Sequence, residues 1–307
     1  MSDWLAMGVR FAQYADLTLL FGMALFGVLS SPEQRQFLPA RTIALAAALA
    51  GLALTMLGTL VVAAGMAGVT PGNVDAETLS LVLFETPTGA AALVRGGALG
   101  IALGVALLWR RQDRNWYLAT ALVSGVALAT LAWTGHAAVS EGLTGVIHRA
   151  SDIVHLLAAS AWLGALAGLF LLLLAPADAM GIDRLDGARR ALDAFSVTGS
   201  VIVGLIVVTG LANSVLILGF DNLAALFTSL WGQLLLVKIL LFGIMLGFAA
   251  ANRYRFVPGL ERALKLNDST RAVQLLRISL LLETGVAVAI LALVAWLGTL
   301  SPTLTEM

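Results

Sequence analysis

All three histidines of the chain lie in one short window, at His136, His148 and His155. Imidazole nitrogen binds Cu, Zn, Fe and Ni, and the chain has no cysteine that could supply a thiolate. A site for a soft or borderline metal therefore depends on imidazole, on thioether sulfur and on nearby carboxylates. We expect the chemistry of this chain to lie around these histidines.

Asp152 shares a predicted helix face with two of the histidines. His148, Asp152 and His155 stand at positions i, i+4 and i+7, which project within roughly 60° of one another on an α-helix. The two imidazoles are about 10 Å apart along the helix axis. They therefore either both extend toward one shared ion or form two successive binding positions along a path. His136 follows Gly135, and a short connection brings it toward this face. We predict a metal site of His136, His148, Asp152 and His155, the alternative being hydrogen-bonded histidines at the membrane interface.

The composition predicts a membrane protein. The chain is 60% hydrophobic and 12% charged, with a mean hydropathy of +0.95 and no net charge, which is outside the range of soluble domains. A spanning helix needs roughly 20 apolar residues, and eight such runs are present. We therefore predict an all-α fold with eight transmembrane helices. The runs are Leu5–Leu29, Thr42–Gly68, Pro87–Trp109, Trp116–Ala138, His148–Leu174, Arg190–Leu218, Leu230–Ala251 and Leu275–Leu300.

Basic residues alternate between the connections. The second and sixth connections carry none, and the fourth carries only Arg149. The positive-inside rule then makes the odd connections cytoplasmic and puts both termini outside. This orientation puts the histidines at the outer face, with His148 at the mouth of the fifth helix. The odd connections carry Arg35, Arg41, Arg110, Arg111, Arg114, Arg184, Arg189, Arg190, Arg253, Arg255, Arg262, Lys265, Arg271 and Arg277.

The two halves of the chain resemble one another at an offset of about 143 residues. Gln13 in the first helix matches His155 in the fifth. The third and seventh helices match at Gly89 and Gly232, Arg95 and Lys238, Gly100 and Gly243, Gly104 and Gly247, and Arg110 and Arg253. We predict two four-helix units of one membrane domain, 1–138 and 139–307, which run in parallel because four is even. The alternative is coincidence, since glycine is frequent in membrane helices.

Polar groups within the apolar runs are expected to face the bundle interior, where they mark paths or structural bridges. Asp16 with Arg95 or Lys238 could form a buried pair, and Glu283 could carry protons or meet a basic partner. The further polar candidates are Arg10, Gln13 and Asn213. Thioether ligands along a path across the membrane could come from the methionines, which could instead serve only as packing. The candidates are Met7, Met66, Met56, Met23 and Met245. No nucleotide-binding or hydrolase motif is present, so we expect neither an enzyme nor a nucleotide-driven pump.

Several of these segments together resemble the bacterial copper resistance D family (CopD/PcoD). They are Trp133-Thr-Gly-His136-Ala, Asp152-x-x-His155 through Trp162-Leu-Gly164, Trp231-Gly-Gln through Lys238 to Asn252-Arg-Tyr-Arg, and Leu276-Arg-Ile-Ser through Glu283 to Pro302. The resemblance implies an inner-membrane protein that moves copper from periplasm to cytoplasm beside a separate periplasmic copper-binding partner. It carries over His136, Asp152, His155, Lys238, Asn252 and Glu283, with no settled role for each.

The first hypothesis is thus a copper transporter that captures the ion at His136, His148, Asp152 and His155. A second is a haem-bearing redox protein, because histidines on neighbouring helices can ligate haem iron. A third is a copper sensor or assembly factor that binds the ion without transporting it. A capture site looks the same in the first and third cases, so the sequence leaves them open.

Overall fold

A computed structural model describes residues 3–134, 142–174, 182–219, 222, 224–265 and 270–300. No strand occurs in these ranges, and eight of their helices are long and apolar enough to cross a membrane. The predicted all-α fold with eight spans is confirmed. His136 lies outside the described residues.

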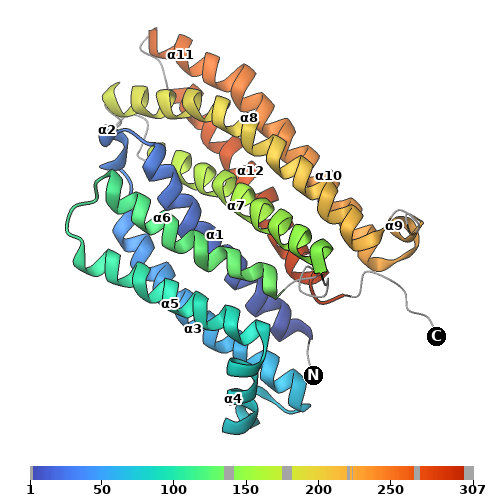
Figure 1. Cartoon of the computed structure of the whole chain (residues 1–307). Helices are drawn as coiled ribbons and strands as arrows, with labels where there is room; N and C mark the ends of the chain where they lie inside the picture. Colours follow the sequence, from blue (N-terminus) through green and yellow to red (C-terminus); the bar gives the residue numbers. More distant parts are fainter. Residues whose placement is uncertain are drawn as a thin grey trace.

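The eight long helices form the bundle drawn in Figure 1. They are α1 (Asp3–Leu29), α3 (Ala40–Ala67), α5 (Pro87–Leu108), α6 (Arg114–Ala129), α7 (Gly142–Leu172), α8 (Ile182–Leu218), α10 (Leu230–Ala251) and α12 (Thr270–Leu297). The shorter elements between them are α2 (Pro32–Arg35), η1 (Pro71–Asn73), α4 (Ala76–Glu85), η2 (Thr130–Trp133), α9 (Ala225–Thr228), the π-helical turn η5 (Asn252–Phe256) and α11 (Val257–Lys265). Below, α1, α3, α5 and α6 are called the first four spans, and α7, α8, α10 and α12 the last four.

Two helices begin earlier than the sequence predicts. The helix α7 starts six residues before His148, at Gly142, and α8 starts at Ile182 instead of Arg190. The additional turns of α8 carry ion pairs at helical spacing, with Asp186 accepting from Arg189 and Arg190. Such pairs stabilise an exposed helical turn without apolar burial, so an apolar-run criterion misses it.

The third span of each half follows a short helix, and the break between the two is built in the same way. Thr86 closes the break between α4 and α5 by accepting from the N–H of Gly89 (3.0 Å) and donating to the carbonyl of Val82 (2.6 Å). Ser229 makes the equivalent pair of bonds between α9 and α10, to Gly232 (3.0 Å) and Ala225 (2.7 Å). A Cβ on either glycine would collide with the backbone of the preceding short helix. Glycine is therefore required at both matched positions.

Matched residues of the two halves also touch each other where α1 crosses α7. A Cβ on Gly22 would lie 2.6 Å from the Cα of Gly164, so only glycine permits this approach. One turn away, the hydroxyls of Thr18 and Ser160 are 3.0 Å apart. Contact between equivalent positions is typical of a two-fold relation. The division into units 1–138 and 139–307 stays a prediction, and these contacts support it.

The two halves differ in how their second and third spans pack. The helix α3 packs along α5, whereas the described residues of α8 and α10 do not pack along one another. Toward one end, Arg253 of η5 donates to the carbonyl of Ser196 (3.1 Å) and to the hydroxyl of Ser200 (2.9 Å) on α8. Toward the other end, Leu218 of α8 belongs to a small apolar cluster with Trp231 of α10. The last four spans are therefore open between these two ties.

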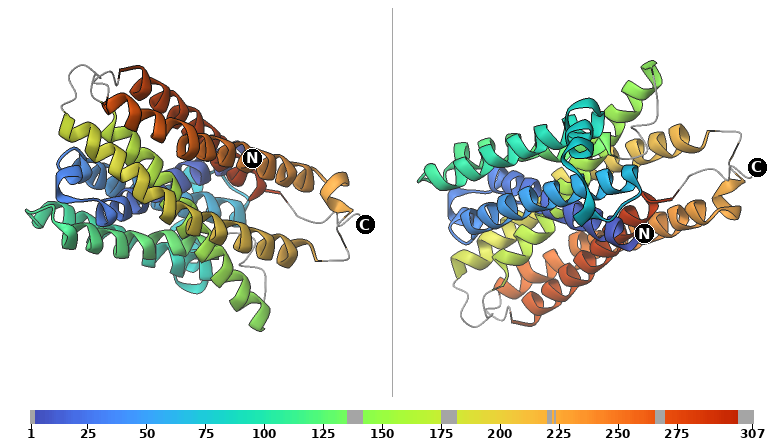
Figure 2. Two further views of the ribbon diagram at one scale, coloured as in Figure 1. Left: turned by 90° about the horizontal axis from the view of Figure 1, so that it is seen from above. Right: turned by 90° about the horizontal axis from the view of Figure 1, so that it is seen from below.

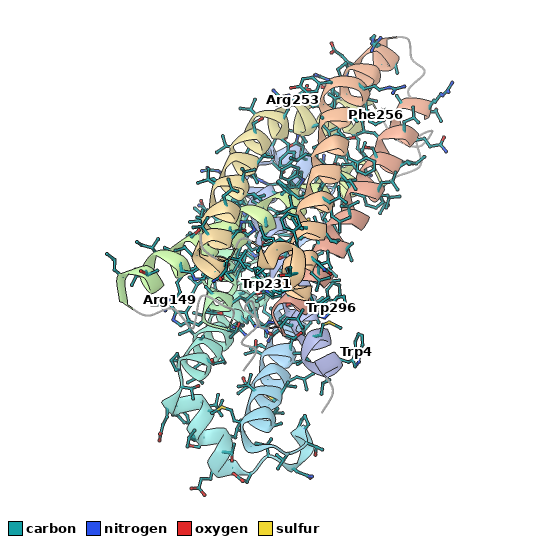
Figure 3. All side chains as sticks on the ribbon, turned by 90° about the vertical axis from the view of Figure 1, so that its right-hand side faces the viewer. Trp4, Arg149, Trp231, Arg253, Phe256 and Trp296 are labelled. Atoms are coloured by element: carbon teal, nitrogen blue, oxygen red, sulfur yellow. The ribbon has the colours of Figure 1, made fainter. Side chains whose placement is uncertain are left out.

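The bundle has one basic end. The helices α2 and α11 lie at the end opposite the start of α1, and the arginine-bearing starts of α6, α8 and α12 lie there as well (Figure 1). In Figure 3, Arg253 is at this end, whereas Trp4, Trp231 and Trp296 are toward the other. The helix α1 packs against α3, α6, α7 and α12, which puts it at the centre of the bundle (Figure 2).

Candidate metal site

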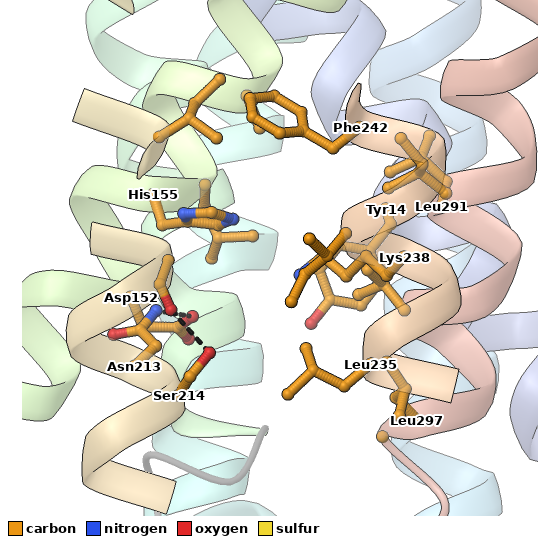
Figure 4. A pocket seen from close by; sticks show the side chains of 18 of the residues that line it. Tyr14, Asp152, His155, Asn213, Ser214, Leu235, Lys238, Phe242, Leu291 and Leu297 are labelled. Carbon is orange, nitrogen blue, oxygen red and sulfur yellow. Dashed lines mark hydrogen bonds between the residues drawn. The ribbon is translucent and has the colours of Figure 1, made fainter. Parts of the chain in front are cut away.

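A cavity of about 360 Å³ occupies the opening in the last four spans. Its walls are formed by α7, α8, α10 and α12, and α1 closes it from the centre of the bundle. Most of the lining is apolar, and the polar side chains gather in one region of it (Figure 4). The site residues that the structure brings together here are His148, Asp152, His155, Asn213 and Lys238.

The imidazole of His155 projects from α7 into this cavity (Figure 4). Its Nδ1 atom lies 2.9 Å from the hydroxyl of Thr209 on α8. That hydroxyl lies 2.5 Å from the carbonyl of Leu205, to which it donates its only proton. The Thr209 oxygen must then accept from Nδ1–H, which leaves the lone pair of Nε2 available. Thr209 thus orients His155 as a metal ligand or a base.

Gly210 supports the same imidazole from the side. A Cβ at this position would lie 3.4 Å from Cε1 of the His155 ring, in van der Waals contact, so a side chain larger than that of alanine would displace the ring. Sequence reasoning missed both Thr209 and Gly210. Threonine and glycine are common in membrane helices, and only the pair Thr-Gly at mid-helix could have served as a signal.

His148 is buried, with 2% of its surface exposed. It lines the cavity from α7, two turns inside the helix rather than at its mouth. The expected position at the helix mouth was therefore wrong, because α7 begins at Gly142. The burial favours a role in the cavity over a role as an interfacial side chain.

Asp152 and Lys238 supply opposite charges on opposing walls. Figure 4 shows Asp152 on the same side of the cavity as His155, with Lys238 of α10 across from both. The Oδ1 atom of Asp152 accepts a long hydrogen bond of 3.4 Å from the amide of Asn213, whose own Oδ1 is buried without a partner. A carboxylate and an imidazole therefore face a space that one ammonium also enters.

Arg10 of α1 ties the cavity rim to two other segments. It lines the cavity and donates to the carbonyl of Gly298 (2.6 Å) and to that of Thr134. Thr134 is two residues before His136 in the chain. At this point the described chain ends close to the rim.

Several predicted pathway residues lie away from the cavity. Met56 and Met66 of α3 are 71% and 60% exposed, and neither they nor Met7 line it. The two exposed methionines belong to the outer surface of α3, a correction to the predicted thioether path. Among the methionines of the described residues, only Met245 lines the cavity, and Met23 is packed in the core.

The predicted buried ion pair of Asp16 is also wrong. No described ion pair joins Asp16 to Arg95 or Lys238, and its Oδ2 atom is buried without a partner against Gly51 of α3. Arg95 instead donates from Nε to the hydroxyl of Thr130 (2.8 Å). Both residues lie in the first four spans and do not line the cavity.

Glu283 lies outside the cavity lining but contacts a residue that belongs to it. Trp162 lines the cavity and donates from Nε1 to Oε1 of Glu283 at 3.0 Å. The described residues contain no group of three or more histidine or acidic side chains gathered as a metal site. Both described histidines project from α7, so a complete ligand set needs a group from another segment.

The geometry defines an eight-span, all-α membrane protein with a histidine-bearing cavity in its last four spans. The profile described as "Copper resistance protein D-like, N-terminal domain" matches residues 1–146, and the profile "Copper resistance protein D" matches residues 189–297. "Copper resistance protein D" of Pseudomonas syringae pv. tomato is 40% identical over 307 residues, which cover 98% of each chain. The chain belongs to the copper resistance protein D family.

Two further relatives show how far the similarity extends. "Inner membrane protein YebZ" of Escherichia coli (strain K12) is 31% identical over 301 residues, which cover 97% of this chain and 98% of that protein. "Copper transport protein CutJ" of Bacillus subtilis (strain 168) is 34% identical over 194 residues, which cover 60% of this chain and 34% of that protein. No solved structure matches the chain significantly.

Proposed function

We propose that this protein is a copper permease of the bacterial inner membrane, with copper as its cargo. The observation that carries the proposal is His155, whose Nδ1 is bonded to Thr209 and whose ring enters the cavity of the last four spans. Two relatives named for copper resistance and copper transport support copper as the ion. A relative named as an inner membrane protein supports the location.

The basic end of the bundle supports the proposed orientation in the membrane. If that end is cytoplasmic, as the positive-inside rule requires, both termini face the periplasm. The cavity rim at Arg10 and His148 then faces the periplasm too. A separate periplasmic copper-binding protein is the partner that we expect to deliver the ion.

In this proposal, capture uses His155 together with His148 and Asp152, and His136 completes the ligand set from the neighbouring segment. Imidazole and carboxylate are suitable copper ligands. Lys238 opposes a bound cation from the facing wall, which limits how tightly the ion is held. A transported ion must bind well enough to enter and weakly enough to leave. Met245 is the thioether that the ion meets farther along the cavity.

The test replaces His155 and its counterpart in the first half. Gln13 is buried and donates to the carbonyl of Leu54 (3.0 Å), but it does not line the cavity. We expect His155→Ala to lower copper uptake into proteoliposomes at least about tenfold, because a ligand is lost. We expect Gln13→Ala to leave uptake within about twofold.

Circular dichroism and size-exclusion chromatography establish that both variants are folded. Uptake by a folded His155→Ala protein equal to that of the original chain would refute capture at this residue. If the original chain binds copper but takes up none, a sensor or assembly role replaces the permease.

A further inference from the structure

A second buried polar cluster lies beside the cavity, around Glu283 of α12. The carboxylate accepts two hydrogen bonds, from Trp162 Nε1 of α7 at 3.0 Å and from Asn252 Nδ2 of η5 at 2.9 Å. Only 1% of Glu283 is exposed. Three separate helical elements therefore converge on one carboxyl group.

The cluster has buried polar atoms without a hydrogen-bond partner. They are Oδ1 of Asn252 and the hydroxyl of Ser279, in residues that are 7% and 4% exposed. Ser279 lies one helical turn before Glu283 on α12, so both side chains share a face. Unpartnered buried acceptors are rare because each loses its hydration, and they call for a ligand, a water or a proton. Asn252 also opens the only π-helical turn in the described residues, a feature frequent at functional sites.

No cation compensates the carboxyl group within the described residues. Lys238 and Asp152 line the cavity, Arg253 donates to Ser196 and Ser200 of α8, and Arg277 donates to the carbonyl of Leu173. Arg255, Glu261, Arg262 and Arg271 are exposed.

Trp162 connects this cluster to the cavity. Its indole is 2% exposed, lines the cavity wall and donates to Glu283. A cation in the cavity and a charge on Glu283 are therefore separated by a single side chain. In an interior of low dielectric constant, opposite charges at such a separation stabilise each other.

We propose that Glu283 is a proton-binding site whose proton is released when copper enters the cavity. The released proton leaves the carboxyl oxygen for a water molecule, and the resulting carboxylate is stabilised by the cation beyond Trp162. Departure of copper reverses the step, with the O–H bond forming again on Glu283. This coupling rests on the proposed copper permease function.

The donor set favours a proton over a metal ion at Glu283. Two N–H groups already point at the carboxylate, and they would repel a second cation. A metal needs several ligands at once, whereas a proton needs one lone pair on the acid and one acceptor for the new O–H group. Asn252 Oδ1 and the Ser279 hydroxyl are the available acceptors.

The first experiment is a pH titration of the full chain by difference infrared spectroscopy. We expect the carbonyl stretch of a buried carboxylic acid to titrate in the original chain and in Asp152→Asn. The same band should disappear in Glu283→Gln and change frequency in Glu283→Asp, which covers the case that the glutamine variant does not fold. Absence of the band from the original chain, or its persistence unchanged in the Glu283 variants, overturns the proton site.

The second experiment adds copper ions to the same protein in weakly buffered solution containing a pH indicator. We expect copper to diminish the infrared band and to release more protons from the original chain than from Glu283→Gln. Copper binding should be weaker in Glu283→Gln than in the original chain, and increasingly so as the pH rises, because the carboxylate and the cation stabilise each other. Equal proton release from both proteins overturns the coupling.

Failure of the copper permease function and failure of the proton coupling give different experimental results. If copper does not bind, the permease and the coupling both fail, whereas the infrared titration still decides whether Glu283 binds a proton. If copper binds and releases no proton from Glu283, only the coupling fails.

Discussion

The first four and the last four spans share the same local hydrogen-bonding pattern but have different roles in the molecule. The breaks at Thr86 and Ser229 are closed by the same pairs of hydrogen bonds. Yet α3 packs along α5, whereas α8 and α10 enclose a cavity. One half of the bundle is thus a packed support, and the other half holds the site.

Equivalent polar positions show the same contrast. Gln13 donates to a backbone carbonyl of α3 and packs against Gly58, whereas His155 bonds to Thr209 of α8 and packs against Gly210. In both halves a polar side chain of the first helix reaches a glycine of the second. Only in the last four spans does the side chain also meet open space. The site therefore depends on the separation of α8 from α10 as much as on its ligands.

The larger change in copper affinity is expected when the matched basic residue of each half is replaced. Lys238 enters the cavity, whereas the matched Arg95 is buried against Thr130. We expect Lys238→Gln to strengthen copper binding about tenfold, or about 1.4 kcal/mol, because a like charge leaves the site. Isothermal titration calorimetry measures the change.

Arg95→Gln is the matched control, and copper affinity should stay within about twofold. Weaker binding after Lys238→Gln would mean that the amine is itself a ligand or that the bound species is an anion. An equal gain from Arg95→Gln would break the distinction between the two halves.

A smaller effect is expected from adding one methyl group to each supporting glycine. A Cβ at Gly210 would lie 3.4 Å from the His155 ring, and a Cβ at Gly58 would lie 2.9 Å from the Gln13 amide. We expect Gly210→Ala to weaken copper binding about threefold, or about 0.6 kcal/mol, because the added methyl group touches the ring and limits its adjustment toward the ion. Copper affinity of Gly58→Ala should be unchanged in the same titration. Equal affinities of the two variants would show that the ring position does not matter.

Much of the fold could be predicted from the sequence because spanning helices must be long and apolar. All eight runs correspond to helices. The starts of α7 and α8 could not be found in this way, since polar turns continue a helix without adding hydrophobicity. For the same reason His148 was expected at a helix mouth and is instead buried.

The candidate site was predictable only in its ligand types. Helical spacing put His148, Asp152 and His155 on one face, and all three line the cavity. Thr209 could not be identified as a partner of His155, because its contact joins helices that the sequence does not orient. The exposure of Met56 likewise depends on the rotation of α3 within the bundle.

The location of the copper site can be tested by anomalous scattering at the copper absorption edge from crystals of this protein soaked in copper. We predict one peak in the last four spans, within bonding distance of Nε2 of His155, and none at the matched position beside Gln13. A peak in the first four spans, or copper bound only at the protein surface, would contradict the division of roles between the two halves.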